Sequence, residues 1–218
     1  MKIYEHLESH LGPIVRGWGP PDDTLGIQVS LFAHTPEQDL HTFCTLGLSE
    51  HILSIGQKEV RQELLFSASK HYSADAIASS LLTFAESIAR SHHGLLRGAV
   101  VEGRPLVEGV AATGIYASVP VFWPDELQVF EDSSPKTVFV WLLPLVGKAE
   151  ADVIASKGWS RSVQTSAVSR RFAFTAHGTI IEVKLWYSWH VTSASRSVSL
   201  SCLETCPSYD IVACSFFP

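Results

Sequence analysis

The chain lacks several features that would mark a secreted or membrane protein. Only one cysteine, Cys44, lies in the first 160 of the 218 residues, so no disulfide framework is expected there. The N-terminal segment has no apolar core of a signal peptide. No apolar run approaches the roughly 20 residues of a membrane-spanning helix. These absences favour a cytoplasmic protein that does not enter a membrane.

Charge is also scarce, and its sign is mostly negative. Charged residues make up 17% of the chain and the net charge is −6, with no cluster of lysine and arginine. Nucleic-acid binding needs a basic patch that neutralises phosphates, so nucleic acid is not an expected partner. The hydrophobic content of 46% predicts a folded chain with a large core. An acidic protein suits a basic partner, although solubility alone also explains such a charge.

Motifs for catalysis and for metal binding are missing or incomplete. The sequence has no phosphate-binding glycine loop and no G-x-S-x-G turn around a nucleophilic serine. Ser49 lies near His51, and several carboxylate pairs occur in loops, which leaves a hydrolase as an alternative. His6 and His10 have helical spacing, but the glutamate between them is not in the position that a zinc protease requires. No catalytic residue, metal or cofactor is therefore predicted.

Hydrophobic periodicity predicts both helices and strands. Apolar residues at spacings near 3.6 indicate helices over 3–11 and 74–91, with Ser73 as the N-cap of the second, and a short helix over 147–156. Residues 17–25 are rich in Gly, Pro and Asp and are predicted to be a loop. Alternating or continuous short apolar runs predict strands over 27–33, 41–48, 60–67, 95–101, 115–123 and 137–145.

The segment 120–145 holds two short apolar runs around an acidic insert, which favours a binding surface on a sheet. Trp141 lies within an apolar run and is expected in the core. Trp18 and Trp123 lie beside loops, where a tryptophan can either anchor an interface or pack in the core, and both readings are open. With Asp125 and Glu126 they form the predicted partner-binding set. The run Arg61-Gln62-Glu63 is expected to supply a cross-strand charge pair.

The composition changes near residue 160. Residues 1–160 carry 11 basic and 19 acidic side chains (net −8), whereas residues 161–218 carry 5 and 3 (net +2) and hold three of the four cysteines. Residues 171–189 are compatible with a β-hairpin that turns at His177-Gly178. We interpret 161–218 as an atypical extension, with three readings open: a shifted reading frame, a poorly ordered tail, or an appended hairpin module.

Several segments over residues 1–160 resemble, in order, bacterial members of the suppressor of fused family. The most specific are TLGLS (45–49), RQELL (61–65) and the strand that ends in WLLP (141–144). The others are YEHLESHLGPI (4–14), GWGPPDD (17–23), LLRGAVV (95–101) and PVFWPDE (120–126). Relatives typically end with a short acidic stretch, from which residues 161–218 depart.

The resemblance implies a fold, a function and a kind of partner. The implied fold is an α+β, sandwich-like domain over 1–160, with a central mixed, largely antiparallel sheet flanked by helices. The implied function is a non-enzymatic, cytoplasmic immunity protein that binds and occludes a bacterial toxin or effector. A structural, oligomerising module remains a further alternative, and the oligomeric state is open.

Overall fold

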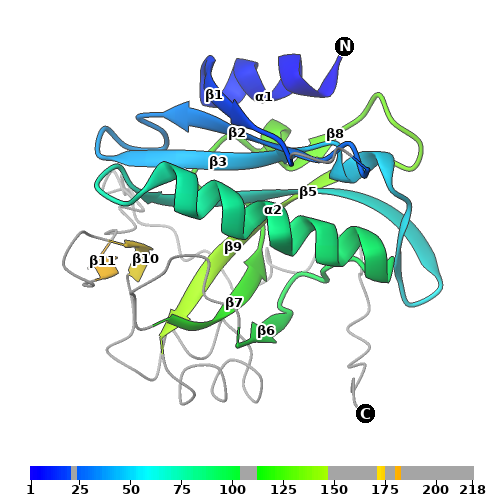
Figure 1. The fold of residues 1–218 in the computed structure, drawn as a ribbon. Helices are drawn as coiled ribbons and strands as arrows, with labels where there is room; N and C mark the ends of the chain where they lie inside the picture. The colour runs from blue at the N-terminus through cyan, green and yellow to red at the C-terminus, as the bar shows by residue number, and fades with distance from the viewer. Residues whose placement is uncertain (21–23, 104–111, 147–170, 175–179, 183–218) are drawn as a thin grey trace, which may run out of the picture. The chain divides into compact units, whose positions relative to one another are not determined.

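The computed structural model describes residues 1–20, 24–103, 112–146, 171–174 and 180–182 of the chain (Figure 1). The helices are α1 (Ile3–Leu11) and α2 (Ala74–Ser91), with the short 3-10 helices η1 (Leu48–Glu50) and η2 (Asp125–Gln128). The strands are β1 (Ile14–Trp18), β2 (Gln28–Ala33), β3 (Leu40–Leu46), β4 (Leu53–Ile55), β5 (Lys58–Ser69), β6 (Val100–Glu102), β7 (Ala112–Ser118), β8 (Val129–Phe130), β9 (Thr137–Val146), β10 (Arg171–Phe174) and β11 (Ile180–Glu182).

Nine of these strands form one mixed sheet. The order along it is β1-β2-β3-β5-β9-β7-β6, with β4 paired to β5 and β8 paired to β9. All neighbours are antiparallel except β5 and β9, which run parallel in the middle of the sheet. The predicted α+β fold with a mixed, largely antiparallel sheet is confirmed.

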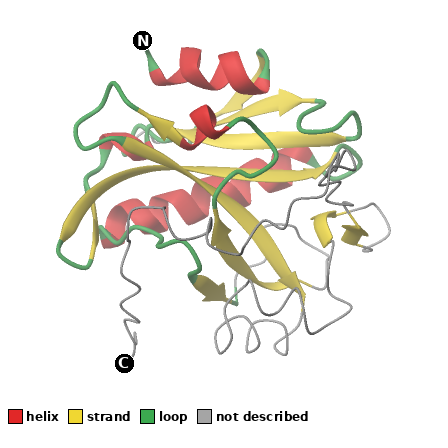
Figure 2. Cartoon of the chain, turned by 180° about the vertical axis from the view of Figure 1, so that it is seen from behind, coloured by secondary structure: helices red, strands yellow, loops and turns green. Residues whose placement is uncertain are grey.

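Each face of the sheet carries its own hydrophobic core. On one face α2 packs through Ile77, Leu81 and Ala85 against alternate residues of the strands. On the other face α1 packs through Leu7 and Leu11, beside η2 (Figure 2). Because neighbouring side chains of a strand point to opposite faces, a central strand must be apolar throughout. This explains the unbroken apolar run of β9.

The strongest periodic segments form the predicted elements. α1 and α2 have the predicted bounds, and the Ser73 hydroxyl accepts a hydrogen bond from the Ala76 amide at 3.3 Å, as expected of an N-cap. The strands predicted near β2, β3, β5 and β9 are present within a few residues. Trp141 is buried, as predicted.

Several boundaries differ from the prediction. Gly17 and Trp18, expected in a loop, end β1, an edge strand that is largely exposed and therefore shows no apolar alternation. Of the strand expected over 95–101 only its last two residues belong to β6, because Gly98 adopts a left-handed φ of +92°. The strand expected over 115–123 ends at Ser118. The helix expected over 147–156 lies outside the described residues.

Two short strands follow in the C-terminal part. β10 and β11 pair antiparallel with each other, within the segment where the sequence predicts a hairpin. The expected turn at His177-Gly178 lies outside the described residues. The interpretation of 161–218 as an atypical extension stays a prediction.

A tight turn joins β3 to η1 and depends on Gly47. Its φ of +101° lies in the left-handed region, and an added Cβ would overlap the backbone carbonyl oxygen of Gly26. A side chain here would therefore strain the backbone and displace the neighbouring chain.

We expect Gly47→Ala to lower the free energy of unfolding by about 3 kcal/mol, the combined scale of backbone strain and overpacking. Chemical denaturation with fluorescence detection would measure it. The control is Gly19→Ala, where the added Cβ would meet the Gln28 side chain at an ordinary 3.6 Å and the change should stay within about 0.5 kcal/mol. An equal loss of unfolding free energy in the two variants would contradict the special role of Gly47 in the turn.

The inner face of α1 carries a buried histidine. His6 is 5% exposed, its ring is stacked on Phe139 at a centroid distance of 5.5 Å, and its Nε2 makes no hydrogen bond. Burial lowers the pKa of His6 below 6.5, the nearby His10 lowers it further, and the Leu127 backbone and Asp132 act in the opposite direction. The surroundings of the His6 ring therefore favour the neutral imidazole over the imidazolium.

Because the pKa of His6 is lower in the folded than in the unfolded chain, its protonation should destabilise the fold as pH falls below 6.5. His6→Phe keeps the aromatic contact and should flatten the dependence of unfolding free energy on pH between 5 and 6.5. The control is the exposed His71→Gln, which should leave that slope as in the wild type. An unchanged slope in His6→Phe would argue against this role.

Candidate functional site

Trp18, the first predicted partner-binding residue, is tied to its own domain. Its indole Nε1 donates a hydrogen bond to Asp75 Oδ1 at 2.7 Å, and the Arg16 guanidinium lies 4.5 Å from the ring centroid. Arg16 also pairs with Asp75 at 2.6 Å. The pKa of Asp75 lies below its usual range because the Trp18 indole and Arg16 favour the carboxylate. Trp18 is half-buried against the α2 core, so only part of it can meet a partner.

Trp123 is a core residue, and its predicted surface position is wrong. Its side chain is 7% exposed, and its Nε1 donates to the Thr35 hydroxyl at 2.9 Å. The ring meets Trp141 edge-on at a centroid distance of 5.8 Å. After β7 the chain folds back over the sheet, which turns this indole inward although its neighbours are loop residues. Trp123 ends the apolar run of residues 119–123, and that run is a signal of burial in the sequence.

Asp125 and Glu126 are exposed on η2, as their placement in a loop predicts. Asp125 accepts a hydrogen bond from the Gln128 amide at 2.8 Å. η2 lies on the α1 face of the sheet, whereas Trp18 packs on the α2 face. The structure therefore separates the predicted set onto two faces. Partner binding by Trp18, Asp125 and Glu126 stays a prediction.

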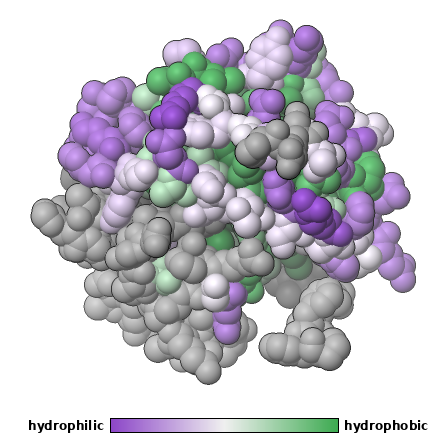
Figure 3. Space-filling view, in the orientation of Figure 1, coloured by the Kyte–Doolittle hydropathy of each residue, from purple (hydrophilic) through white to green (hydrophobic). Residues whose placement is uncertain are grey.

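Apolar surface does not single out another site on the α2 face. Figure 3 shows hydrophilic residues spread over the described part of this face, with small hydrophobic areas between them. The large exposed apolar side chains of the described residues are scattered along the chain: Met1, Tyr4, Val15, Ile52, Leu96 and Val121. Scattered apolar residues are normal for a protein surface.

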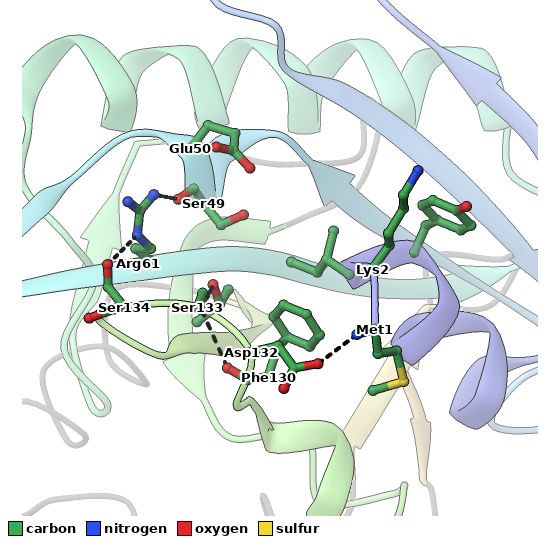
Figure 4. Close-up of a pocket in the computed structure, with 12 residues that line it drawn as sticks. Met1, Lys2, Ser49, Glu50, Arg61, Phe130, Asp132, Ser133 and Ser134 are labelled. Atoms are coloured by element: carbon green, nitrogen blue, oxygen red, sulfur yellow. Dashed lines mark hydrogen bonds and ion pairs between the residues drawn. The ribbon is translucent and has the colours of Figure 1, made fainter.

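A hollow of about 440 Å³ opens where four segments meet (Figure 4). The segments are residues 1–4 at the start of α1, the η1 turn, β5 at Arg61, and the loop from β8 to β9. Its wall combines apolar side chains with hydroxyl groups and charges. The Met1 amino group pairs with Asp132 at 2.7 Å, and the Ser133 hydroxyl bonds that of Thr137 at 2.9 Å.

Arg61 forms one end of this hollow. Its Nη1 donates to the Ser49 carbonyl at 2.5 Å and its Nε donates to the Ser134 carbonyl at 3.4 Å. These two carbonyls belong to different loops, so the guanidinium joins the η1 turn to the β8–β9 loop. Glu50 lines the same hollow, but its carboxylate points away from the guanidinium in Figure 4.

Behind the hollow, Glu63 is fully buried and holds the η1 turn in place. Its carboxylate accepts hydrogen bonds from the Thr45 hydroxyl at 2.5 Å and from the amides of Gly47 and Ser49, both at 3.0 Å. Burial raises the pKa of Glu63 to about 7, although these donors favour the ionised form. These three hydrogen bonds make Glu63 an anchor for the turn.

The residues considered for catalysis and metal binding contact other groups of the protein. His51 Nε2 bonds the Leu25 carbonyl at 2.8 Å, and the Ser49 backbone is engaged with Glu63 and Arg61. His6 and His10 touch through their rings, with centroids 4.7 Å apart. Within the part of the chain that the structure describes, no three His, Cys, Asp or Glu side chains are grouped to hold a metal ion.

Comparison with known proteins identifies the family. The model of the family "Suppressor of fused protein (SUFU)" matches residues 23–167, more than half of the chain. The chain belongs to the suppressor of fused family. This is a regulatory, protein-binding family, and the resemblance seen in the sequence is confirmed. No curated protein matches the chain by sequence.

Two solved structures of SUFU proteins share the fold. A SUFU homolog from Neisseria gonorrhoeae is 19% identical, with a TM-score of 0.56 over 73% of this chain and 84% of the homolog. The crystal structure of the Sufu–Fu complex gives 13% identity and a TM-score of 0.56 over 74% of this chain and 80% of the other. None of the described helices is long and apolar enough to cross a membrane.

The segment RQELL, which carries the family resemblance, supplies Arg61 to the hollow. Among the residues that the structure describes, neither Arg61 nor Glu63 forms the expected cross-strand charge pair. Arg61 bonds two carbonyls, and Gln62 bonds both the amide and the carbonyl of Leu95 at 2.8 Å. Glu63 bonds the η1 turn. The sequence does carry a signal for the role of Glu63, because its carboxylate comes directly before the apolar run LLF. A charge that is buried in a strand must find polar partners.

We expect the stability of this SUFU domain to fall as pH rises from about 4.5 to 7. The pKa of Glu63 is higher in the folded than in the unfolded chain, so the folded state loses a favoured proton over that range. The full shift corresponds to about 3 kcal/mol. Glu63→Gln keeps the shape and the acceptor oxygen and should remove this contribution to the pH slope.

Urea denaturation at several pH values would measure the slope. Glu59→Gln, at an exposed position near the start of the same strand, is the matched control and should behave as the wild type. A wild-type slope in the Glu63→Gln variant would rule out titration of the buried carboxyl.

Proposed function

We propose that this SUFU domain is a non-enzymatic immunity or inhibitor protein of the bacterial cytoplasm, which neutralises a toxin or effector by covering its functional surface. One observation carries the proposal: a member of the same family and fold forms a solved complex with a protein partner, Fu. Occlusion needs a rigid surface and no chemistry. The two-sided core supplies rigidity, because both faces of the sheet are packed against helices.

Charge supports a basic partner. Residues 1–160 carry a net charge of −8, and the exposed Asp125 and Glu126 stand side by side on η2. Complementary charges speed the encounter of two proteins and help to orient them. Many toxins that act on nucleic acid need a basic surface, which an acidic inhibitor can cover.

Growth rescue tests the proposal. The partner is first identified by co-purification and mass spectrometry and by inspecting the neighbouring open reading frames. Co-expression with that partner should restore the growth that the partner alone inhibits. Failure to rescue, with both proteins folded and expressed, would contradict an immunity role.

The double variant Asp125→Ala/Glu126→Ala should slow association with the partner roughly tenfold at low salt, because electrostatic steering acts mainly on the association rate. Stopped-flow or surface-binding kinetics would measure it. Glu37→Ala/Glu59→Ala removes the same charge from other exposed positions and is the control. Trp18→Ala tests the opposite face. Full association rates in all three variants would place the partner elsewhere.

A further inference from the structure

The Arg61 guanidinium shares the hollow with the Lys2 ammonium group, the Met1 amino group and the carboxylates of Glu50 and Asp132. Arg16 pairs with Asp75 and Arg90 with Glu86, but within the described residues Arg61 makes no ion pair. Its two acceptors are backbone carbonyls, which orient the guanidinium without neutralising it. Partial withdrawal of an arginine from water costs free energy when no anion accompanies it. A ligand or a water molecule that accepts its remaining N–H groups reduces this cost.

The guanidinium is positioned in advance for a further acceptor. Nε and Nη1 are directed by carbonyls from two loops, whereas Nη2 makes no hydrogen bond within the described part of the chain. A planar guanidinium held in this way loses little freedom when it binds an anion. Carboxylates match its fork of N–H groups in both geometry and charge.

The other residues that line the hollow indicate which kind of residue would lie next to the bound anion. Ile3 and Tyr4 from α1, together with the edge of Phe130, give the hollow an apolar side. Ser133 and Thr137 already bond each other through their hydroxyls. The hollow thus places the Arg61 guanidinium beside an apolar wall, an arrangement that fits an acidic residue with an apolar neighbour in the same segment.

We propose that the hollow at Arg61 is a docking site for an acidic side chain, aspartate or glutamate, of the protein partner, with an apolar neighbour seated against Ile3, Tyr4 and Phe130. This inference rests on the proposed function, because it takes the ligand to be part of a protein. The anion binds at the free edge of the guanidinium between the η1 turn and the β8–β9 loop. It acts as an orienting contact within an interface that is otherwise steered by negative charge on this chain.

Titration of the whole chain with small peptides tests the site without a known partner. The probes are a capped dipeptide of phenylalanine and glutamate, its glutamine analogue, and a phenylalanine–glutamine dipeptide with a free C-terminal carboxylate. Nitrogen resonances of the Arg61 guanidinium should shift saturably with the first probe alone. An equal response to the glutamine analogue, a response only to the free terminus, or equal shifts at Arg90 would each overturn the proposal.

Variants then test the site with the partner. Arg61→Gln should weaken partner binding at least tenfold, as expected for a central arginine of an interface. Arg61→Lys should not restore it, because an ammonium group lacks the planar fork. Arg90→Gln is the matched control and should bind as the wild type. Thermal unfolding of each variant checks the fold, and the wild-type titration does not depend on any variant.

The two proposals can fail separately. If the glutamate dipeptide binds at Arg61 but no partner is neutralised, the docking site stands and the immunity role falls. If co-expression restores growth while Arg61→Gln binds the partner fully and no peptide shifts its resonances, the immunity role stands and the docking site falls.

Discussion

The parallel pairing of β5 with β9 is the constraint on which the rest of the fold depends. Both strands are buried on two faces, so a helix must cover each side of the sheet. Their register places Arg61 opposite Thr137, where β9 begins. That register brings the start of β5 beside the loop that ends at Thr137, within reach of the Ser134 carbonyl. The hollow is therefore a product of strand register.

Three consecutive polar side chains of β5 fasten the surrounding loops to the sheet. Arg61 and Glu63 reach the η1 turn on one face, and Gln62 reaches Leu95 on the other. Period-two alternation of a strand explains this division. Loops that carry binding residues are most useful when a rigid scaffold positions them. Here a core strand supplies both the scaffold and the side chains that hold the loops.

The sequence predicted the parts of the fold in which periodicity is strong. The α2 helix, with its apolar stripe and Ser73 cap, and the continuous apolar run of β9 leave few alternatives. β1 was missed because an exposed edge strand has no buried face to impose alternation. Trp123 was misplaced because folding of a loop onto the sheet is decided by distant residues such as Thr35, 88 positions away. The contacts of Arg61 with Ser49 and Ser134 also join residues that are distant in the sequence, so local patterns do not predict them.

The separation of the two faces also narrows where a partner can bind. Arg61, Glu63 and Leu65 are every second residue of β5 and therefore point to the same face, the one that carries α1 and η2. The hollow at Arg61 and the acidic pair Asp125 and Glu126 thus belong to one side of the sheet. Opposite charges on one surface serve different steps of recognition. In the proposed interaction, net negative charge would attract a basic protein, and the arginine fixed by carbonyls would discriminate against segments without a carboxylate. A partner bound to this face would need both a basic surface and one well-placed acid, a stricter requirement than charge attraction alone.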